Sequence, residues 1–172
     1  MKRNEKTNVY MVIKLHRYYG DETITKSVME VFLEGDTEAR MVCEARESGY
    51  ADYAETFPGA SQFCLPRGRW RMKVGNSPYG PMGLRVVRCP GHRQVYIGHR
   101  WGRQCVEGEI LIGEAVYHYY TDENGQEVEY PKKRRIDRGE ETYRKLDKLV
   151  YEAYCRGEEF VMEVNNEEVN NG

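Results

Sequence analysis

Apolar residues recur at helical spacing in one long stretch of this chain, which lies near its C-terminal end. Asp137 with Glu140 three residues later fits a capping box at the start of a helix, and Gly157 fits its end. One face of this helix is apolar, so we expect it to pack against a sheet. The residues that form this face are Tyr143, Leu146, Leu149, Val150, Ala153 and Tyr154.

The rest of the chain consists of short β-branched and aromatic runs separated by turn residues. Residues 24–47 are typical of a hairpin about the turn "EGDT", and residues 115–130 of a hairpin about Asn124–Gly125. The sequence therefore predicts a β-rich α+β fold with one C-terminal helix. We expect a flexible N-terminus at 1–8, a single domain at 9–164 and a disordered tail at 165–172. Its expected core includes Trp70, Met72, Val74, Val86, Tyr96, Ile110, Ile112, Leu146, Leu149 and Val150.

Composition limits the setting of the protein. The chain has five cysteines and no C-x-x-C motif, which favours a reducing compartment or free thiols. It has no apolar run long enough to span a membrane, and the run at 9–13 is too short for a signal peptide. We therefore expect a cytoplasmic protein, with virion association or another export route left open. Nothing in the sequence calls for a cofactor.

Charge is distributed unevenly along the chain. The stretch 56–106 contains nine basic residues and no Asp or Glu, which leaves 17 basic against 28 acidic residues elsewhere, from totals of 26 and 28. Such a block favours a positive surface that faces an anionic partner, although arginines on solvated strand faces would give the same pattern. In the segment 65–74, alternation places Arg69, Arg71 and Lys73 opposite the expected core face.

The stretch "VYIGHRWGRQCVEGEILIGEA" carries the residue types of a nucleophilic site. His99 can act as a base for the Cys105 thiol, and arginines nearby favour a thiolate. A buried, inert Cys105 in the core is the alternative. Cys89, His92, His99 and Cys105 together also offer a tetrahedral zinc ligand set, but their spacing matches no standard finger, so we expect no metal.

Nucleic-acid binding is a further alternative. Arginines interleaved with Trp70, Trp101, Tyr79 and Tyr96 can hold phosphates and stack bases, and "PKKRR" at 131–135 adds a basic cluster. The sequence pI of about 6.1 is well below that of the basic domains that usually bind nucleic acid, so we rank this class last.

Several motifs taken together resemble a family of unknown function from Bacteroidetes genomes and phages. Its pattern "I-P-x-G-x-Y-x-V", "I-H-x-G-N" and "G-C-I-L-V-G" resembles "LPRGRWRMKV", "YIGHRWG" and "EGEILIG" here, in the same order, over roughly residues 9–164. That family is in turn similar to YkuD-like L,D-transpeptidases, in which a cysteine attacks a peptidoglycan peptide and a histidine is the base. The resemblance implies a mostly antiparallel sheet or barrel-like core, with YkuD-like architecture favoured.

The chain departs from this pattern at the nucleophile. Glu109 stands where the family has its cysteine, and a carboxylate would give an anhydride as its acyl product. We therefore expect an inactive relative of a Cys–His enzyme, in a phage or mobile element, that recognises or acts on peptidoglycan peptides or another anionic ligand. The alternative is a virion-associated or host-interaction scaffold. The expected site is His99, Cys105 and Glu109, with Arg69, Arg71, Arg88, Arg100 and Arg103 binding the ligand.

Overall fold

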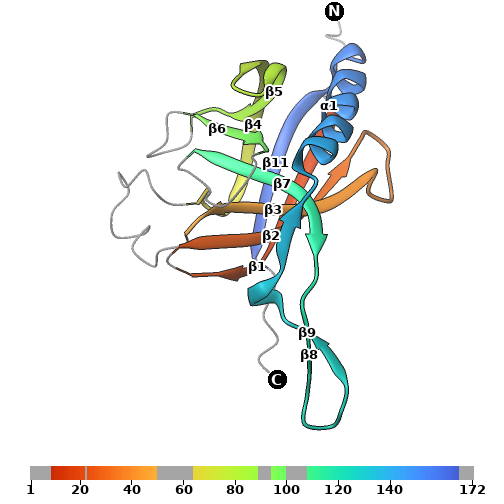
Figure 1. Cartoon of the computed structure of the whole chain (residues 1–172). Helices are drawn as coiled ribbons and strands as arrows, with labels where there is room; N and C mark the ends of the chain where they lie inside the picture. The colour runs from red at the N-terminus through yellow and green to blue at the C-terminus, as the bar shows by residue number, and fades with distance from the viewer. Residues whose placement is uncertain (1–8, 22, 50–63, 89–93, 100–107, 167–172) are drawn as a thin grey trace, which may run out of the picture.

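The computed structural model describes residues 9–21, 23–49, 64–88, 94–99 and 108–166. Besides the strands it contains the 3-10 turn η2 (Pro131–Lys133) and the helix α1 (Gly139–Cys155) (Figure 1). The strands are β1 (Tyr10–Gly20), β2 (Ile24–Phe32), β3 (Met41–Ser48), β4 (Gly68–Ser77), β5 (Gly80–Val86), β6 (Val95–Gly98), β7 (Glu109–Val116), β8 (Tyr119–Thr121), β9 (Glu127–Glu129), β10 (Arg135–Asp137) and β11 (Glu159–Asn166).

Nine strands form one curved sheet in the order β10-β7-β3-β2-β1-β11-β4-β5-β6, and β6 also pairs with β7. This additional pairing closes every strand except β10 into a barrel-like ring. The pairs β1–β11 and β6–β7 are parallel, whereas the other pairs are antiparallel. The prediction of a β-rich α+β fold with a mostly antiparallel, barrel-like core and one helix is confirmed.

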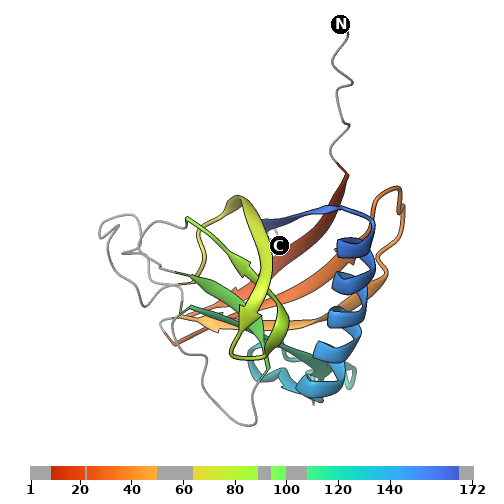
Figure 2. The ribbon, with the colours of Figure 1, turned by 90° about the horizontal axis from the view of Figure 1, so that it is seen from above.

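The core lies inside this ring. In β1 every second residue from Met11 is buried, and the register continues this inward face into both neighbours, because Ile13 is opposite Val31 and Met162. Helix α1 lies along one side of the curved sheet (Figure 2) and adds its apolar face to the same core. The helix residues buried there are Tyr143, Leu146, Val150 and Ala153.

Most of the residues expected in the core are buried, and the exceptions have local reasons. Trp70, Val74 and Leu149 are only partly buried at the edge of the core. The prediction that Tyr96 lies in the core is wrong, because Tyr96 is paired with Arg85 on the outside of the ring, whereas Ile97 points inward. The buried members are Met72, Val86, Ile110, Ile112, Leu146 and Val150.

The start of the helix differs from the predicted capping box. The N-cap is Arg138, with a left-handed backbone (φ 51°) and no side-chain cap, and Asp137 accepts a hydrogen bond from the Arg138 amide instead. Thr142 Oγ1 donates to the Arg138 carbonyl. The predicted end is confirmed, because Gly157 has φ 73° just after α1. Strand β11 extends to Asn166, two residues beyond the expected domain boundary.

One end of the ring interior is polar rather than apolar. Arg17 and Glu47 continue the inward faces of β1 and β3 and are 5% and 2% exposed. Arg17 Nη2 donates to both carboxylate oxygens of Glu47 at 3.0 Å and also to the Leu65 carbonyl. The Leu65 amide donates to Glu47 at 2.9 Å. This buried ion pair therefore holds the segment that leads into β4.

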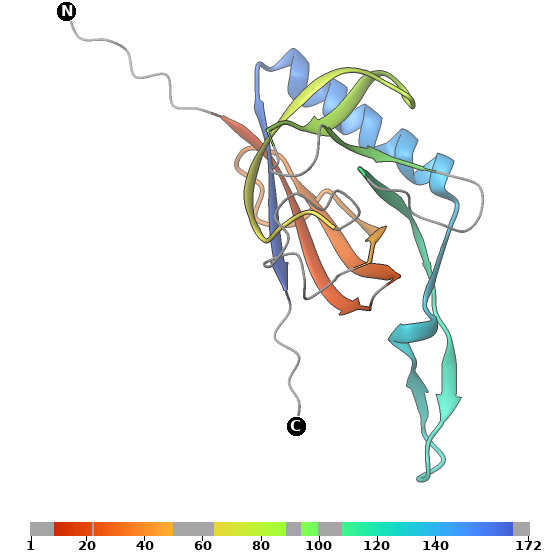
Figure 3. The same ribbon diagram turned by 90° about the vertical axis from the view of Figure 1, so that its left-hand side faces the viewer.

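A two-stranded hairpin, β8–β9, projects from the end of β7 and stands away from the ring (Figures 1 and 3). Asp122 shapes its turn, since its Oδ1 accepts from the amides of Asn124 and Gln126, each at 2.9 Å. Gly125 has φ 75°, which only glycine adopts readily. The hairpin predicted about Asn124–Gly125 is confirmed. Within the described residues, no helix has both the length and the apolar character needed to cross a lipid bilayer.

Candidate functional site

His99 and Glu109 come together at one end of the parallel pair β6–β7. His99 directly follows β6, and Glu109 is the first residue of β7. Glu109 is paired with Tyr96 of β6. Tyr79, from the turn between β4 and β5, bridges them. Its hydroxyl donates to Glu109 Oε1 at 2.7 Å, and its ring centroid is 5.6 Å from that of His99. Tyr79 thus brings His99 and Glu109 into one cluster, although the sequence did not identify Tyr79 for this site.

Two glycines make room for this arrangement. A Cβ at Gly98 would lie 2.1 Å from ring atoms of Tyr79, so the ring rests directly on the backbone of β6. A Cβ at Gly83 would likewise lie 2.1 Å from Ser77 Oγ, which accepts a hydrogen bond from the Tyr79 amide. Because a strand glycine often marks such a close approach, Gly98 was the signal in the sequence that could have revealed Tyr79.

The helix forms the other wall of the site. The Tyr143 ring lies 5.1 Å from His99 and 5.9 Å from Tyr79, so the three rings pack as one aromatic group. Burial raises the pKa of Tyr143, whose side chain also hydrogen bonds to Ser77. A Cβ at Gly139 would lie 3.1 Å from His99 Cβ, so the first turn of α1 fits closely against the histidine. Among the described residues, His99 therefore packs against aromatic rings and has no carboxylate partner.

Other predicted site residues cannot be compared with this geometry. Cys105, Arg100 and Arg103 lie outside the described residues, as do Cys89 and His92 of the alternative zinc set. Among the cysteines that are described, Cys43 and Cys64 are buried and Cys155 is exposed. Burial raises the pKa of the Cys43 thiol to about 12, which keeps it protonated at neutral pH.

Basic residues line the outside of β4 and β5 next to this site. We call Arg69, Arg71, Lys73 and Arg85 the basic face. Lys73 is paired with Arg85, Arg85 with Tyr96, and Tyr96 with Glu109, so one row of side chains crosses four strands on the outer side of the ring. This row joins the basic face to Glu109.

The basic face is only weakly neutralised. Arg69 is 3.5 Å from Glu163 and Arg71 is 3.9 Å from Glu159, and these exposed pairs contribute little. Within the described chain, Lys73 and Arg85 form no ion pair, and Arg85 Nε is a buried donor without an acceptor. Arg88 is exposed beyond the end of β5, with a left-handed backbone, and is not part of the row.

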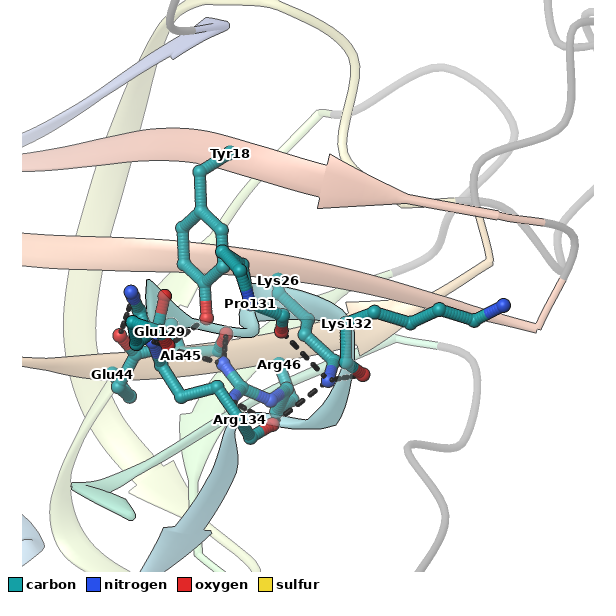
Figure 4. A network of polar contacts seen from close by, with 9 residues as sticks. All are labelled: Tyr18, Lys26, Glu44, Ala45, Arg46, Glu129, Pro131, Lys132 and Arg134. Atoms are coloured by element: carbon teal, nitrogen blue, oxygen red, sulfur yellow. Dashed lines mark hydrogen bonds and ion pairs between the residues drawn. The ribbon is translucent and has the colours of Figure 1, made fainter. Parts of the chain in front are cut away.

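A second polar cluster lies on the outside of β1, β2 and β3, beneath η2 (Figure 4). Glu44 is its centre: it accepts from the Tyr18 hydroxyl at 2.6 Å, from Arg46 at 2.6 Å and from Arg134 at 2.8 Å. Arg134 also donates to Glu129 of β9 at 2.8 Å. Arg134 belongs to the "PKKRR" cluster that suggested nucleic-acid binding, but its guanidinium is used inside the protein.

Lys26 completes this cluster. Its ammonium donates to the carbonyls of Lys132 at 2.5 Å, Arg134 at 2.8 Å and Pro131 at 3.4 Å, which fixes η2 on β2. Lys26 is only 5% exposed. Burial, reinforced by the nearby Arg46 charge, lowers the pKa of Lys26 from 10.5 to about 8. No sequence pattern indicates this burial, because alternation places Lys26 on a solvated strand face.

The lowered pKa of Lys26 predicts how stability changes in alkaline solution. Between about pH 8 and 10.5 the unfolded chain keeps this proton while the folded chain releases it, so Lys26 by itself makes the free energy of unfolding rise with pH. Below pH 8 both states are protonated and Lys26 adds no pH dependence. Urea unfolding at several pH values should show that the free energy of unfolding changes with pH at a less positive slope in Lys26→Met than in the wild type. Lys132→Met, an exposed neighbour, is the control, and equal slopes in all three proteins would contradict the shift.

Comparison of the chain with family models, with curated proteins and with solved structures finds no match. Glu109, engaged by a tyrosine hydroxyl, can accept hydrogen bonds but offers no thiol for acyl transfer. The adjoining basic face can hold carboxylates or phosphates.

Proposed function

We propose that this protein binds peptides of bacterial peptidoglycan, or a related anionic ligand, without cleaving them, as an inactive relative of Cys–His L,D-transpeptidase-like domains. One observation carries the proposal. Glu109, at the family's cysteine position, lies in the same cross-strand row as Tyr96, Arg85 and Lys73. The position of the lost nucleophile thus adjoins a surface suited to carboxylates.

The chemistry of the ligand fits this surface. Peptidoglycan stem peptides carry free carboxylates, which guanidinium groups bind with paired hydrogen bonds. The Arg71 side chain is 71% exposed, so its guanidinium can bind a new partner. The hydroxyl of Tyr79 donates a hydrogen bond to Glu109. The Tyr79 hydroxyl therefore fills the place that an attacking group would need. Binding without turnover follows from these features.

Titration calorimetry with a tetrapeptide-stem muropeptide tests the proposal. We expect the protein to bind the muropeptide with an affinity that falls as salt is added. The double change Arg71→Glu with Lys73→Glu should lower this affinity by about tenfold or more. Lys145→Glu with Lys148→Glu, an equal change of charge on exposed residues of α1, should leave the affinity unchanged. No binding by the wild type, or tighter binding to DNA than to muropeptide, would overturn the cell-wall assignment.

Turnover is measured in the same samples. We expect no cleavage or exchange of the muropeptide by the wild type. Cleavage that disappears in Cys105→Ala would show a working thiol and would overturn the assignment as an inactive relative. Cleavage that survives Cys105→Ala but disappears in Glu109→Gln would show carboxylate chemistry and would overturn it equally.

The alternative of a non-enzymatic interaction scaffold in a virion or host complex is favoured by a different feature. The β8–β9 hairpin exposes three tyrosines and has no role at the site described above. A hairpin of this kind is a surface for another macromolecule.

A further inference from the structure

The hairpin that projects from β7 has the composition of a binding surface. We call residues 117–130, which include β8 and β9, the arm. Tyr117, Tyr119 and Tyr120 are 53%, 55% and 48% exposed, although tyrosine normally buries much of its ring. An isolated two-stranded hairpin is only marginally stable in water. Aromatic exposure on such an element indicates that a partner covers it.

The arm is also strongly acidic. It contains four acidic residues and no Lys or Arg. Asp122 is used in the turn, and Glu129 is used in the ion pair with Arg134. Glu123 and Glu127 are exposed, and neither forms an ion pair with any residue that the structure describes. The arm therefore presents tyrosine rings and free carboxylates together, which suits a basic partner.

The polar cluster of Figure 4 fixes the base of the arm. Arg134 ties β9 to β3 through Glu129 and Glu44, and Lys26 holds the carbonyls that directly follow the arm. The Arg134 guanidinium also lies 5.0 Å from the ring of Tyr117. Because the base is held at several points, the arm loses less freedom when a partner binds it.

The same chain carries a surface of opposite charge, which its own arm cannot reach. Strand β7 leads from Glu109, beside the basic face, to Val116 at the base of the arm, a distance of about 23 Å at 3.3 Å per residue. The arm then continues away from β4 and β5 (Figures 1 and 3). The two complementary surfaces can meet only between different copies of the chain.

We propose that the arm of one copy docks on the basic face of a second copy. Glu123 and Glu127 face the guanidinium and ammonium groups of β4, and the arm tyrosines stack on arginines as Tyr117 already does on Arg134. The contact is head-to-tail, so it builds open chains or closed rings rather than an isologous dimer. It uses the surface of the proposed function, and muropeptide and arm should therefore compete.

Sedimentation velocity over a range of protein concentrations tests this contact. The arm variant is Glu123→Lys with Glu127→Lys, and the face variant is Arg71→Glu with Lys73→Glu. We expect the wild type to self-associate and each variant to associate at least about a hundredfold more weakly, because like charges then meet. Glu38→Lys with Glu141→Lys makes the same charge change as the arm variant on exposed residues elsewhere, and should associate like the wild type.

Mixing the variants decides the geometry. The arm variant keeps an intact basic face, and the face variant keeps an intact arm. When the two variants are mixed, the intact arm of one protein can pair with the intact face of the other. We expect alternating association of the two variants in the mixture, because the intact arm meets an intact face and the reversed arm meets a reversed face, and restored association when both sets of changes are combined in one chain. A wild type that stays monomeric at about millimolar concentration, or a mixture without complex, would overturn the proposal.

The outcome is independent of the proposed function, because association is measured without ligand. Muropeptide binding can be measured on the arm variant, which keeps its basic face and is expected to be monomeric. Loss of self-association with intact muropeptide binding in that variant supports both proposals. Self-association of the wild type, together with no muropeptide binding by the arm variant, would support the contact between copies and would overturn the cell-wall ligand.

Discussion

Replacing Glu47 by glutamine is expected to lower the free energy of unfolding by about 3–5 kcal/mol, the usual loss when one partner of a buried ion pair is removed. The guanidinium of Arg17 would stay inside the ring without a negative partner, at 5% exposure. Solvent cannot relieve this charge, because Leu65 covers it and hydrogen bonds to both residues. Urea unfolding measured by circular dichroism gives the change directly.

Two comparisons test the reason for this loss. Glu163→Gln removes the partner of the exposed Arg69, at 3.5 Å, and should change stability by less than about 1 kcal/mol. Arg17→Met with Glu47→Leu removes both charges and should recover much of the loss, although the backbone groups of Leu65 then lack partners. A Glu47→Gln protein as stable as the wild type would show that water reaches this end of the ring.

Alternation along single strands predicted much of the fold. It identified the β2–β3 hairpin, the arm hairpin and the inward face of β4 from residues close in sequence. Alternation even indicated the buried ion pair. Arg17 continues the buried series Met11, Ile13 and Leu15 of β1, and Glu47 continues the series Cys43 and Ala45 of β3. Closure of the ring had no local signal. It depends on the parallel pairs β1–β11 and β6–β7, and alternation along one strand does not show which strand is its neighbour.

The candidate site was predicted only in part, for a similar reason. His99 and Glu109 lie ten residues apart, and the resemblance marked both. Tyr79 comes from another hairpin and reaches Glu109 only because β5 pairs with β6. The three acceptor carbonyls of Lys26 come from more than a hundred residues away in the sequence. Contacts of this kind follow from topology, which the spacing of residues does not contain.

The second large effect is expected from Gly98→Ala. A methyl group at this position would lie 2.1 Å from the Tyr79 ring, so the ring must leave its place on β6. The protein then loses the hydrogen bond of 2.7 Å to Glu109 and the packing on His99. Overpacking of this kind costs about 1–3 kcal/mol of stability. Gly75→Ala is the matched control, because its new Cβ would lie 3.9 Å from the nearest atom, in Arg85.

A double-mutant cycle separates the clash from any intrinsic effect of alanine in β6. Tyr79→Ala alone should destabilise the protein, because it removes a ring and a hydrogen-bond donor. Adding Gly98→Ala to that variant should then cost almost nothing, since the space above β6 is empty, so the two changes are strongly non-additive. Additive losses would show that the Tyr79 ring does not lie on Gly98. In that case the bridge between His99 and Glu109, on which the assignment of an occupied, non-catalytic site depends, would not exist.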